Sequence, residues 1–505
     1  MMKSEVGSRK AASRNQSRSS SLLSFALCLL LTSPLFSACL LRNSQPNLPR
    51  NFPSRTALNH RGKPPLILIP GVLGSQLVNR RTGEKVWPSL GASDDDSLAL
   101  PITSDNFADN TDDLIANEIL ETAKFGPLIP EISVYDRLVA ALQYYGGYRR
   151  GSLESPPPDG DHDTFYVFAY DWRRDNVESA RLLARRIAAL KQQFGRPDLR
   201  FDIVAHSMGG LVARYYAMYG EQELSAAPRP DWSGARHLNR LILMGTPNAG
   251  SMDALRTLVL GYSITGTSRP RLGFLRQLDR DSVFTTPSAY QLLPRNASAR
   301  FLNEQLAPLD LDLFNVETWR RYGWSAAFQV KLSKGEQKKL KREGADAITQ
   351  ATEKLAASRE RFLRAALARA AAFHRALDAI STLPDSLRLY LFGGDCEDTL
   401  DAALIVSDQK TGQPLTLFQP SRALSGDLRS RAWKTMFAPG DGRVTRRSLL
   451  GLKLEPEAVA EGDDSPRAMK QQPFYAVFDC EVHGDLPLNT RVQNNLLTLL
   501  LGNSY

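Results

Sequence analysis

Residues 201–214 read FDIVAHSMGGLVAR, and this stretch decides the fold class. Residues 201–204 are predicted to form a buried strand, and residues 209–214 to begin a helix. Ser207 falls in the sharp turn between them, which is the setting of a nucleophile elbow. The backbones of strand and helix nearly touch at such a turn, so the neighbours of the serine must be small. Ala205 stands where the consensus has glycine, and its one extra methyl group is a modest steric demand.

Other parts of the chain show the alternation of strands and helices that such a turn requires. Continuous apolar runs of the buried-strand type occur at residues 65–70, 165–170, 201–205, 241–244, 387–392 and 474–478. Apolar residues recur at helical spacing over Val177–Phe194, and a second helix is expected over Gly209–Tyr219. Strands that alternate with helices predict an α/β fold, with a mostly parallel sheet covered by helices on both faces.

Residues 251–385 interrupt this alternation, because they contain no convincing buried strand. Their second half carries an apolar seam at steps of three, four or seven residues, formed by Ile348, Leu355, Phe362, Ala366, Ala370, Phe373, Leu377 and Ile380. We expect a helical cap inserted over the carboxyl edge of the sheet, where folds of this class bind ligands. The basic stretch 331–342 fits a solvated helix face better than a contact with anionic lipid. The core would then comprise residues 65–250 and 386–505.

The N-terminus is typical of an exported protein. Residues 1–38 combine a basic, serine-rich leader with the apolar run 22–31, LLSFALCLLL, which is too short to span a membrane comfortably. Small residues precede Cys39, as in a bacterial lipobox, so residues 1–38 are interpreted as a signal peptide and Cys39 as a lipidation site. Plain secretion and an uncleaved anchor are the alternatives. Residues 39–64 are polar and dotted with proline, and we expect them to tether a periplasmic or outer-membrane lipoprotein, or to precede the core of a secreted one.

Charge and cysteine content restrict the partners and the compartment. The chain has a formal charge of +9, of which the five basic residues and one acidic residue in 1–38 account for +4. The remaining +5 is too diffuse to indicate a nucleic-acid partner. Beyond the leader and Cys39, the remaining cysteines are Cys396 and Cys480, an even pair in an oxidising compartment. A disulfide between them is expected, with two unpaired thiols as the alternative.

A serine nucleophile needs a base, and the chain offers six histidines. Five of them stand in the tether, in a polar loop, beside the serine, before a strand and on the inserted helix, namely His60, His162, His206, His237 and His374. His483 follows the last apolar run, where a loop reaches the same sheet edge as the elbow. His483 is therefore the predicted base, by position and by elimination.

The acid that orients this base should lie between the serine and the histidine along the chain. Asp441 is on a glycine-flanked turn that can present its side chain. Asp395 comes shortly after the apolar run 387–392 and competes for the role. The residues alone favour Asp441 and leave Asp395 open.

The oxyanion formed by attack on a carbonyl needs preorganised N–H donors. Met208, the residue after the nucleophile, supplies one. The loop Pro70–Ser75 follows an early strand, and we expect Val72 to supply the other, because Gly71 and Gly74 let the backbone turn its amides inward. A tight strand exit is the alternative interpretation of this loop. The histidines show no metal-ligand spacing such as HExxH, so neither a metal nor another cofactor is expected.

Several short motifs occur together in one order along the chain. They are Pro70–Leu77 (PGVLGSQL), Ala169–Arg173 (AYDWR), Ala205–Gly209 (AHSMG), Gly440–Val444 (GDGRV) and His483. Together they resemble the lecithin:cholesterol acyltransferase family, which also holds lysosomal phospholipase A2 and the phospholipid:diacylglycerol acyltransferases. The resemblance spans residues 65–505. It departs from the family at Ala205 and at Ser75, where animal members have asparagine.

The resemblance implies an α/β-hydrolase core with a cap and a lid. It favours Asp441 over Asp395 as the acid, and it supports the assignment of Val72 and Met208 as oxyanion donors. Trp87 matches a tryptophan that lies near the acyl site in the family, which implies a contact with the substrate.

The charged residues of the AYDWR motif are interpreted as structural. Asp171 and Arg173 would form a buried pair that braces the site.

The functional prediction is an exported serine lipase, phospholipase or O-acyltransferase, with Ser207, Asp441 and His483 as its triad. Its partners would be a membrane surface and a phospholipid or acylglycerol substrate, with water, a sterol or another alcohol accepting the acyl group. The alternative is a catalytically silent α/β-hydrolase fold that serves as a surface binding module.

Overall fold

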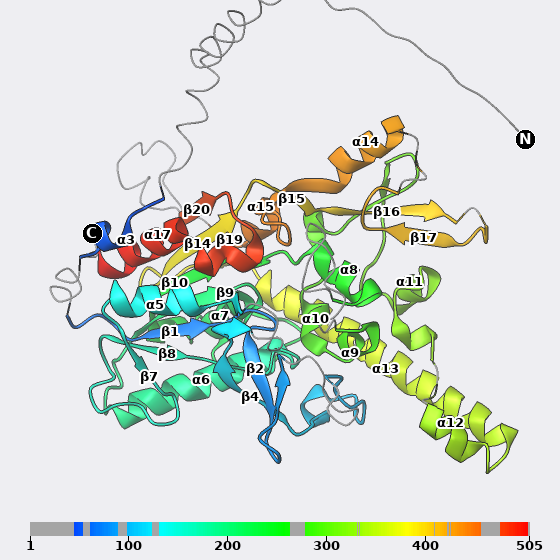
Figure 1. Cartoon of the computed structure of the whole chain (residues 1–505), viewed down its shortest axis with the longest axis horizontal. Helices are drawn as coiled ribbons and strands as arrows, with labels where there is room; N and C mark the ends of the chain where they lie inside the picture. Colours follow the sequence, from blue (N-terminus) through cyan, green and yellow to red (C-terminus); the bar gives the residue numbers. More distant parts are fainter. Residues whose placement is uncertain are drawn as a thin grey trace, which may run out of the picture. The chain divides into compact units, whose positions relative to one another are not determined.

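A parallel sheet of seven strands forms the centre of the structure, a computed structural model (Figure 1). Its strands are β1 (Leu66–Ile69), β7 (Arg149–Gly151), β8 (Thr164–Val167), β9 (Phe201–His206), β10 (Leu238–Met244), β14 (Arg388–Gly394) and β20 (Tyr475–Asp479). They lie in the order β20-β14-β10-β9-β1-β8-β7, and each neighbouring pair is parallel. The structure describes residues 45–53, 61–88, 98–123, 131–262, 278–330, 332, 334–408, 410–421, 424, 426–455 and 475–502. Apart from β7, every strand of this sheet coincides with a predicted apolar run.

Helices cover both faces of this sheet. Alternate residues of a strand point to opposite faces, and β1 divides its four apolar side chains in this way. Ile67 and Ile69 belong to the core shared with α6 (Asn176–Gln193) and α7 (Met208–Tyr219). The other two side chains of β1 pack in the core shared with α5 (Asp136–Tyr144) and α17 (Thr490–Leu501). The predicted α/β-hydrolase fold is confirmed by this arrangement.

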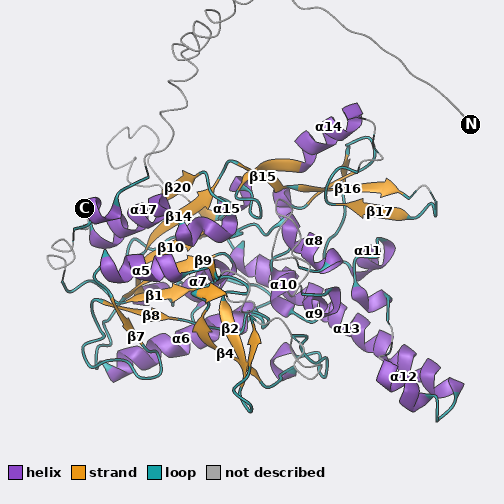
Figure 2. Ribbon diagram, viewed as in Figure 1, coloured by secondary structure: helices purple, strands orange, loops and turns teal. Residues whose placement is uncertain are grey.

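The region between β10 and β14 contains the helices expected of a cap. They are α8 (Met252–Leu260), α9 (Arg280–Phe284), α10 (Pro287–Gln291), α11 (Val316–Arg321), α12 (Lys334–Leu340) and α13 (Ala345–Leu377). Figure 2 shows these helices together to one side of the sheet. The predicted apolar seam is buried from Phe362 to Leu377 along α13. The prediction that Ile380 belongs to this seam is wrong, because α13 ends at Leu377 and the Ile380 side chain is 66% exposed.

The insertion also contains strands, which the sequence did not predict. A four-stranded sheet has the order β12-β11-β16-β17, from Pro308–Leu309, Arg300–Leu302, Ala402–Ser407 and Pro414–Leu417. β11 has three residues, which is too short for a recognisable apolar run. This sheet combines strands from both sides of residue 385, where the sequence analysis placed the end of the insertion.

The remaining elements are short and connect these parts. They are β2 (Ser75–Asn79), β3 (Lys85–Trp87), β4 (Leu114–Ile119), β5 (Thr122–Ala123), β6 (Ile132–Ser133), β13 (Ser381–Thr382), β15 (Glu397–Leu400), β18 (Phe437–Gly440), β19 (Leu454–Glu455), α14 (Gly426–Met436) and α15 (Arg446–Leu449). Of these, β18 ends directly before the turn that holds Asp441, and it pairs antiparallel with β15.

The expected tether between residues 39 and 64 includes a short helix, α3 (Leu48–Asn51). Leu48 and Phe52 are buried in a small cluster with Leu497 and Leu501 of α17. Cys39 and the predicted signal peptide lie outside the described residues. Within the ranges given above, none of the helices has the length and apolar character needed to cross a membrane.

Candidate active site

Ser207 occupies the turn between β9 and α7. Its backbone has φ 53° and ψ −125°, a conformation that a serine adopts only where the surrounding structure holds it. Because α7 begins at Met208, the side chain of Ser207 is presented at the carboxyl ends of the parallel strands. The turn has the geometry that the sequence pattern predicts for a nucleophile elbow.

The small neighbours of Ser207 have separate steric reasons. A β-carbon at Gly209 would clash with the carbonyl oxygen of Pro70, and one at Gly210 would clash with the side chain of Thr246. Ala205, in contrast, is fully buried in regular β9 with its methyl group accommodated. Glycine is therefore required after the serine, while alanine is tolerated two residues before it.

His483 meets Ser207 at this edge of the sheet. It begins a short helix, His483–Leu488, which follows β20. Its Nε2 lies 2.8 Å from the Oγ of Ser207, and its Nδ1 lies 2.8 Å from Oδ2 of Asp441. A carboxylate can only accept a hydrogen bond, so Nδ1 carries the ring proton and Nε2 is left to accept the serine hydroxyl. The structure thus brings the three predicted triad residues together in one hydrogen-bonded chain.

Asp441 is held by the turn on which it lies. Its Oδ1 accepts the backbone N–H groups of Arg443 and Val444, at 3.0 and 2.7 Å. Its own carbonyl oxygen accepts the N–H of His483 at 2.8 Å. The competing carboxylate, Asp395, faces Arg446 instead, at 3.6 Å. The geometry therefore favours Asp441 as the partner of the histidine.

A disulfide joins the loops that carry the acid and the base. It connects Cys396 and Cys480, whose Cα atoms are 5.2 Å apart, and this is the pairing that the sequence analysis expected. Cys396 precedes β15, the strand that pairs with β18 before Asp441. Cys480 precedes His483 by three residues. The bond thus links two segments whose relative position determines the contact between Asp441 and His483.

The loop after β1 lies directly against Ser207. A β-carbon at Gly71 would come 2.8 Å from the Cβ of Ser207, so only glycine allows this approach. Among the residues that the structure describes, no acceptor is hydrogen-bonded to the N–H of Val72 or of Met208. The two predicted oxyanion donors are therefore free to bind a ligand, and their catalytic role stays a prediction.

Trp87 lies behind this loop. Its indole N–H donates to the carbonyl of Leu73 at 2.9 Å, and its ring packs edge-on against Trp172 at 5.9 Å between centroids. These contacts show it bracing the loop that carries Val72. The contact of Trp87 with a substrate stays a prediction.

The charged residues of the AYDWR motif form a larger cluster than expected. The guanidinium of Arg173 is fully buried and binds Asp171 at 2.8 Å. It also binds both carboxylate oxygens of Asp112, at 2.6 and 2.9 Å. This cluster fixes the segment after β8 against the segment before β4, which supports the structural interpretation of the motif.

One polar contact beside the triad was missed by the sequence analysis. The Nδ1 of His206 lies 2.7 Å from the hydroxyl of Tyr135, and its Nε2 lies 3.1 Å from the carbonyl oxygen of His483. Burial, together with the neighbouring His483, lowers the pKa of His206 to about 3, so this ring is neutral. The sequence shows His206 beside the serine, but no pattern connects it with Tyr135, which is 71 residues away.

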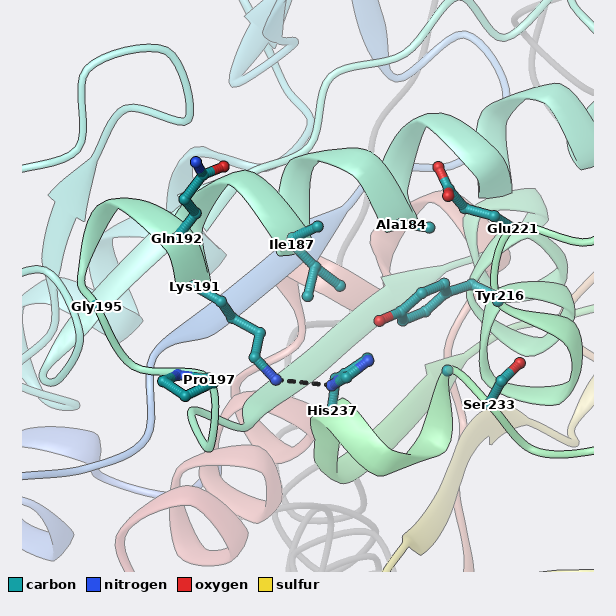
Figure 3. Close-up of a pocket in the computed structure, with 13 residues that line it drawn as sticks. Ala184, Ile187, Lys191, Gln192, Gly195, Pro197, Tyr216, Glu221, Ser233 and His237 are labelled. Atoms are coloured by element: carbon teal, nitrogen blue, oxygen red, sulfur yellow. Dashed lines mark hydrogen bonds between the residues drawn. The ribbon is translucent and has the colours of Figure 1, made fainter.

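A cavity of about 620 Å³ is lined by α6, α7 and the segment Ser233–His237, and no triad residue lines it (Figure 3). Lys191 donates to Nδ1 of His237 at 2.8 Å, and burial lowers the pKa of both groups. Because Nδ1 accepts from an ammonium group, the other ring nitrogen of His237 carries the proton and cannot serve as a base. This cavity therefore lacks an activated nucleophile. Within the described ranges, no three His, Cys, Asp or Glu side chains are grouped to bind a metal ion.

Comparison with known proteins gives one family and a set of lipid-active relatives. The model of the lecithin:cholesterol acyltransferase family matches residues 160–343, which include Ser207 and end before Asp441. The lysosomal phospholipase A and acyltransferase of Bos taurus is 24% identical over 309 residues, 52% of this chain and 67% of that protein. The protein of the same description from Rattus norvegicus is 28% identical over 263 residues, 48% of this chain and 59% of its own length. The alignments thus span about six tenths of the relatives' length.

The solved structures that align with this chain have lower sequence identity. The crystal structure of the Tle4–Tli4 complex aligns with a TM-score of 0.41 and 11% identity, covering 88% of this chain and 99% of that one. The lipase BlEst2 of Bacillus licheniformis in its propeptide form aligns with a TM-score of 0.31 and 12% identity, covering 88% of this chain and 51% of that one.

Proposed function

We propose that this chain is a member of the lecithin:cholesterol acyltransferase family, whose model matches residues 160–343, and that it cleaves a lipid ester through an acyl intermediate on Ser207. The relatives described as phospholipase A and acyltransferase support a lipid ester hydrolase or acyltransferase. The observation that carries the proposal is the hydrogen-bonded chain from Ser207 through His483 to Asp441, with 2.8 Å at each contact.

Acylation would follow from this geometry. Nε2 of His483 takes the hydroxyl proton of Ser207 while Oγ attacks the ester carbonyl of a phospholipid or acylglycerol. Asp441 keeps the proton on Nδ1 and stabilises the imidazolium that forms. The negative oxygen of the tetrahedral intermediate accepts the N–H groups of Val72 and Met208. Collapse of the intermediate breaks the ester bond, and His483 returns the proton to the departing alcohol or lysolipid.

Deacylation would repeat these steps with a new acceptor. Water or an alcohol gives its proton to Nε2 of His483 and attacks the acyl carbon, and Ser207 leaves with that proton restored. Water as the acceptor releases a fatty acid, whereas a sterol or diacylglycerol hydroxyl yields a new ester. Hydrolysis and transfer share the acyl-enzyme and differ in the molecule that enters the site.

We infer that this reaction takes place outside the cytoplasm, at a membrane surface. The basic, apolar leader and the small residues before Cys39 support export, with lipidation of Cys39 as the anchor. The disulfide between Cys396 and Cys480 supports it independently, because disulfides persist in oxidising compartments. Mass spectrometry of the N-terminal peptide from the native host tests this part. A diacylated Cys39 is expected, whereas an unmodified leader peptide contradicts export.

Labelling with a fluorophosphonate tests the proposed nucleophile. We expect stoichiometric modification of the peptide that contains Ser207, and no modification of that peptide in Ser207→Ala. Ser407, an exposed serine at the end of β16, provides a matched Ser407→Ala control that should be labelled like the unmodified protein. A folded protein that takes no label would instead support the silent binding module.

Product analysis separates hydrolysis from transfer. Vesicles of phosphatidylcholine with excess cholesterol or diacylglycerol are incubated with the protein, and the lipids are identified by mass spectrometry. Acylated cholesterol or triacylglycerol shows transfer. Exclusive release of fatty acid with the acceptor in excess rules it out, and Ser207→Ala should give neither product.

A further inference from the structure

The histidine beside the nucleophile is buried and hydrogen-bonded at both ring nitrogens. His206 is 7% exposed, and its ring centroid lies 5.0 Å from that of His483. On one side it meets the hydroxyl of Tyr135, a buried residue directly before α5. On the other side it meets the backbone carbonyl of His483. The proposed acyl transfer uses neither His206 nor Tyr135.

Only one assignment of hydrogen-bond donors and acceptors satisfies this network. The N–H of Gly71 donates to the hydroxyl oxygen of Tyr135 at 2.9 Å, since a backbone N–H can only donate. The carbonyl of His483 can only accept, so Nε2 of His206 must carry a proton and donate to it. Nδ1 of a neutral His206 then accepts the hydroxyl proton of Tyr135. Every polar atom of the bridge is satisfied in this single tautomer.

The two ends of the bridge are parts of the proposed active site. Gly71 precedes Val72 in the loop that lies against Ser207, and its own approach to Ser207 excludes any larger residue. The other end is the backbone of the predicted base. In the sheet, β1 and β20, which lead to these two ends, are separated by β9, β10 and β14. The bridge therefore connects loops that are not neighbours in the sheet.

We propose that Tyr135 and the neutral His206 are positioning residues that fix the oxyanion loop relative to His483. This inference rests on the proposed function of Ser207. The bridge ties the peptide that precedes Val72 to the backbone of the base, across the nucleophile between them. Loss of the bridge would leave substrate binding intact and displace the N–H donor from the developing oxyanion, which forms only in the transition state.

Replacements at position 206 test the bridge at each end. His206→Gln keeps an acceptor for Tyr135 and a donor for the carbonyl of His483, whereas His206→Asn reaches only the nearer partner and His206→Leu reaches neither. With p-nitrophenyl butyrate as a soluble ester, we expect kcat to fall by about tenfold to a hundredfold in His206→Leu, with KM within about twofold. Kcat should decrease in the order Gln, Asn, Leu. Full kcat in His206→Leu, or a rise in KM with unchanged kcat, would overturn the proposal.

Replacement of the tyrosine gives a matched pair of variants. Tyr135→Phe removes the hydroxyl that joins Gly71 and His206, and should lower kcat as His206→Leu does. Tyr148→Phe also removes one buried tyrosine hydroxyl, but this one has no hydrogen-bond partner within the described part of the chain. We expect Tyr148→Phe to keep the kcat of the unmodified protein. Equal losses in the two variants, or losses that follow the melting temperature, would assign Tyr135 a purely structural role.

A spectroscopic measurement tests the bridge independently of turnover. In protein with ¹⁵N-labelled histidine, His206→Gln identifies the resonances of this ring. We expect the neutral tautomer protonated at Nε2 at pH 7, and Tyr135→Phe should shift the Nδ1 resonance. A ring protonated at Nδ1 would overturn the bridge even if turnover is normal. Absence of any turnover by the unmodified protein, with the expected tautomer present, would contradict the proposed function instead.

Discussion

The sheet edge and the insertion each contain a buried histidine, and the two rings differ in their hydrogen bonds. Burial is the main reason that the pKa of both His206 and His374 is lowered to about 3. His206, at the sheet edge, has partners at both ring nitrogens. His374, on α13, donates from Nε2 to the carbonyl of Gln291 at 2.9 Å, while its Nδ1 has no partner among the described residues. The sheet edge specifies the orientation of its ring, whereas the insertion holds its ring by one bond and by packing.

The charged groups of the two regions differ in the same way. At the sheet edge, Asp441 accepts hydrogen bonds at both carboxylate oxygens and is fully paired. Where the insertion meets the core, Arg295 binds Asp378 at 3.0 Å but leaves its Nη1 without a partner within the described ranges. We conclude that the hydrogen bonds at the sheet edge fix the orientation of its side chains. Those of the insertion mainly hold the insertion on the core. Changes at the sheet edge should affect activity, and changes in the insertion should affect stability.

The largest effect is expected at the sheet edge, in Asp441→Asn. An amide at this position favours the wrong tautomer of His483, so kcat should fall by about 10⁴-fold. The measurement is turnover of a soluble ester, with the melting temperature recorded alongside. Asp395→Asn is the matched control and should leave kcat unchanged, because Asp395 faces Arg446. A larger loss in the control would exchange the roles of the two aspartates.

Arg295→Met should be the strongest disruption of the insertion. It leaves the partly buried carboxylate of Asp378 without its cationic partner and with only the amide of Asn296 as a hydrogen-bond donor, which costs about 3 kcal/mol of unfolding free energy. Urea unfolding gives this value, and kcat of the folded protein should change little. Arg320→Met removes two exposed ion pairs, with Glu317 and Glu360, and should cost about 1 kcal/mol in total. Similar costs in the two variants would contradict the distinction.

Ser207→Gly should stabilise the protein while it abolishes activity. Glycine adopts the positive φ of 53° without the strain that serine carries, a gain of about 1 kcal/mol. Ser207→Ala removes the same hydroxyl and keeps the β-carbon, so it separates strain from the loss of the side chain. Urea midpoints of the two variants measure the difference. If Ser207→Gly is no more stable than Ser207→Ala, the elbow is unstrained.

The last prediction concerns acid stability and His374. An unfolded histidine has a pKa near 6.5 and the folded one a pKa of about 3, so the unfolded state binds the extra proton between these values. Stability from this residue is therefore present above pH 6.5 and is lost as the pH falls. His374→Gln keeps an amide donor for Gln291 and does not titrate. Its melting temperature should fall less between pH 7 and pH 5 than that of the unmodified protein, and equal falls would contradict the buried neutral ring.

The sheet edge was largely predictable from sequence because its determinants are local. The buried strands are continuous apolar runs, and the turn at Ser207 follows from small residues between a strand and a helix. His483 could be selected because few histidines follow a strand. Asp441 and Asp395 both lie between Ser207 and His483 along the chain, so the residues alone left the choice of acid open. The resemblance to a family favoured Asp441, which the structure places beside His483.

What was missed depends on contacts between distant segments. Tyr135 meets His206 across 71 residues, and no periodicity in either segment indicates the other. The pairing of β11 with β16 joins three-residue and six-residue strands from either side of α13. Leu48 and Phe52 lie in a polar segment and are buried only because α17 offers an apolar face. Such contacts are determined by tertiary packing and carry no local pattern.

Direct observation of the acyl-enzyme tests whether Ser207 carries the acyl group. The protein is mixed with p-nitrophenyl butyrate, quenched in acid within the first turnover, and digested for mass spectrometry. We expect a butyryl group on the peptide that contains Ser207, abundant in the unmodified protein and absent in His483→Ala and Ser207→Ala. Turnover of the ester with no acyl group on Ser207, or an acyl group on another residue, would contradict it.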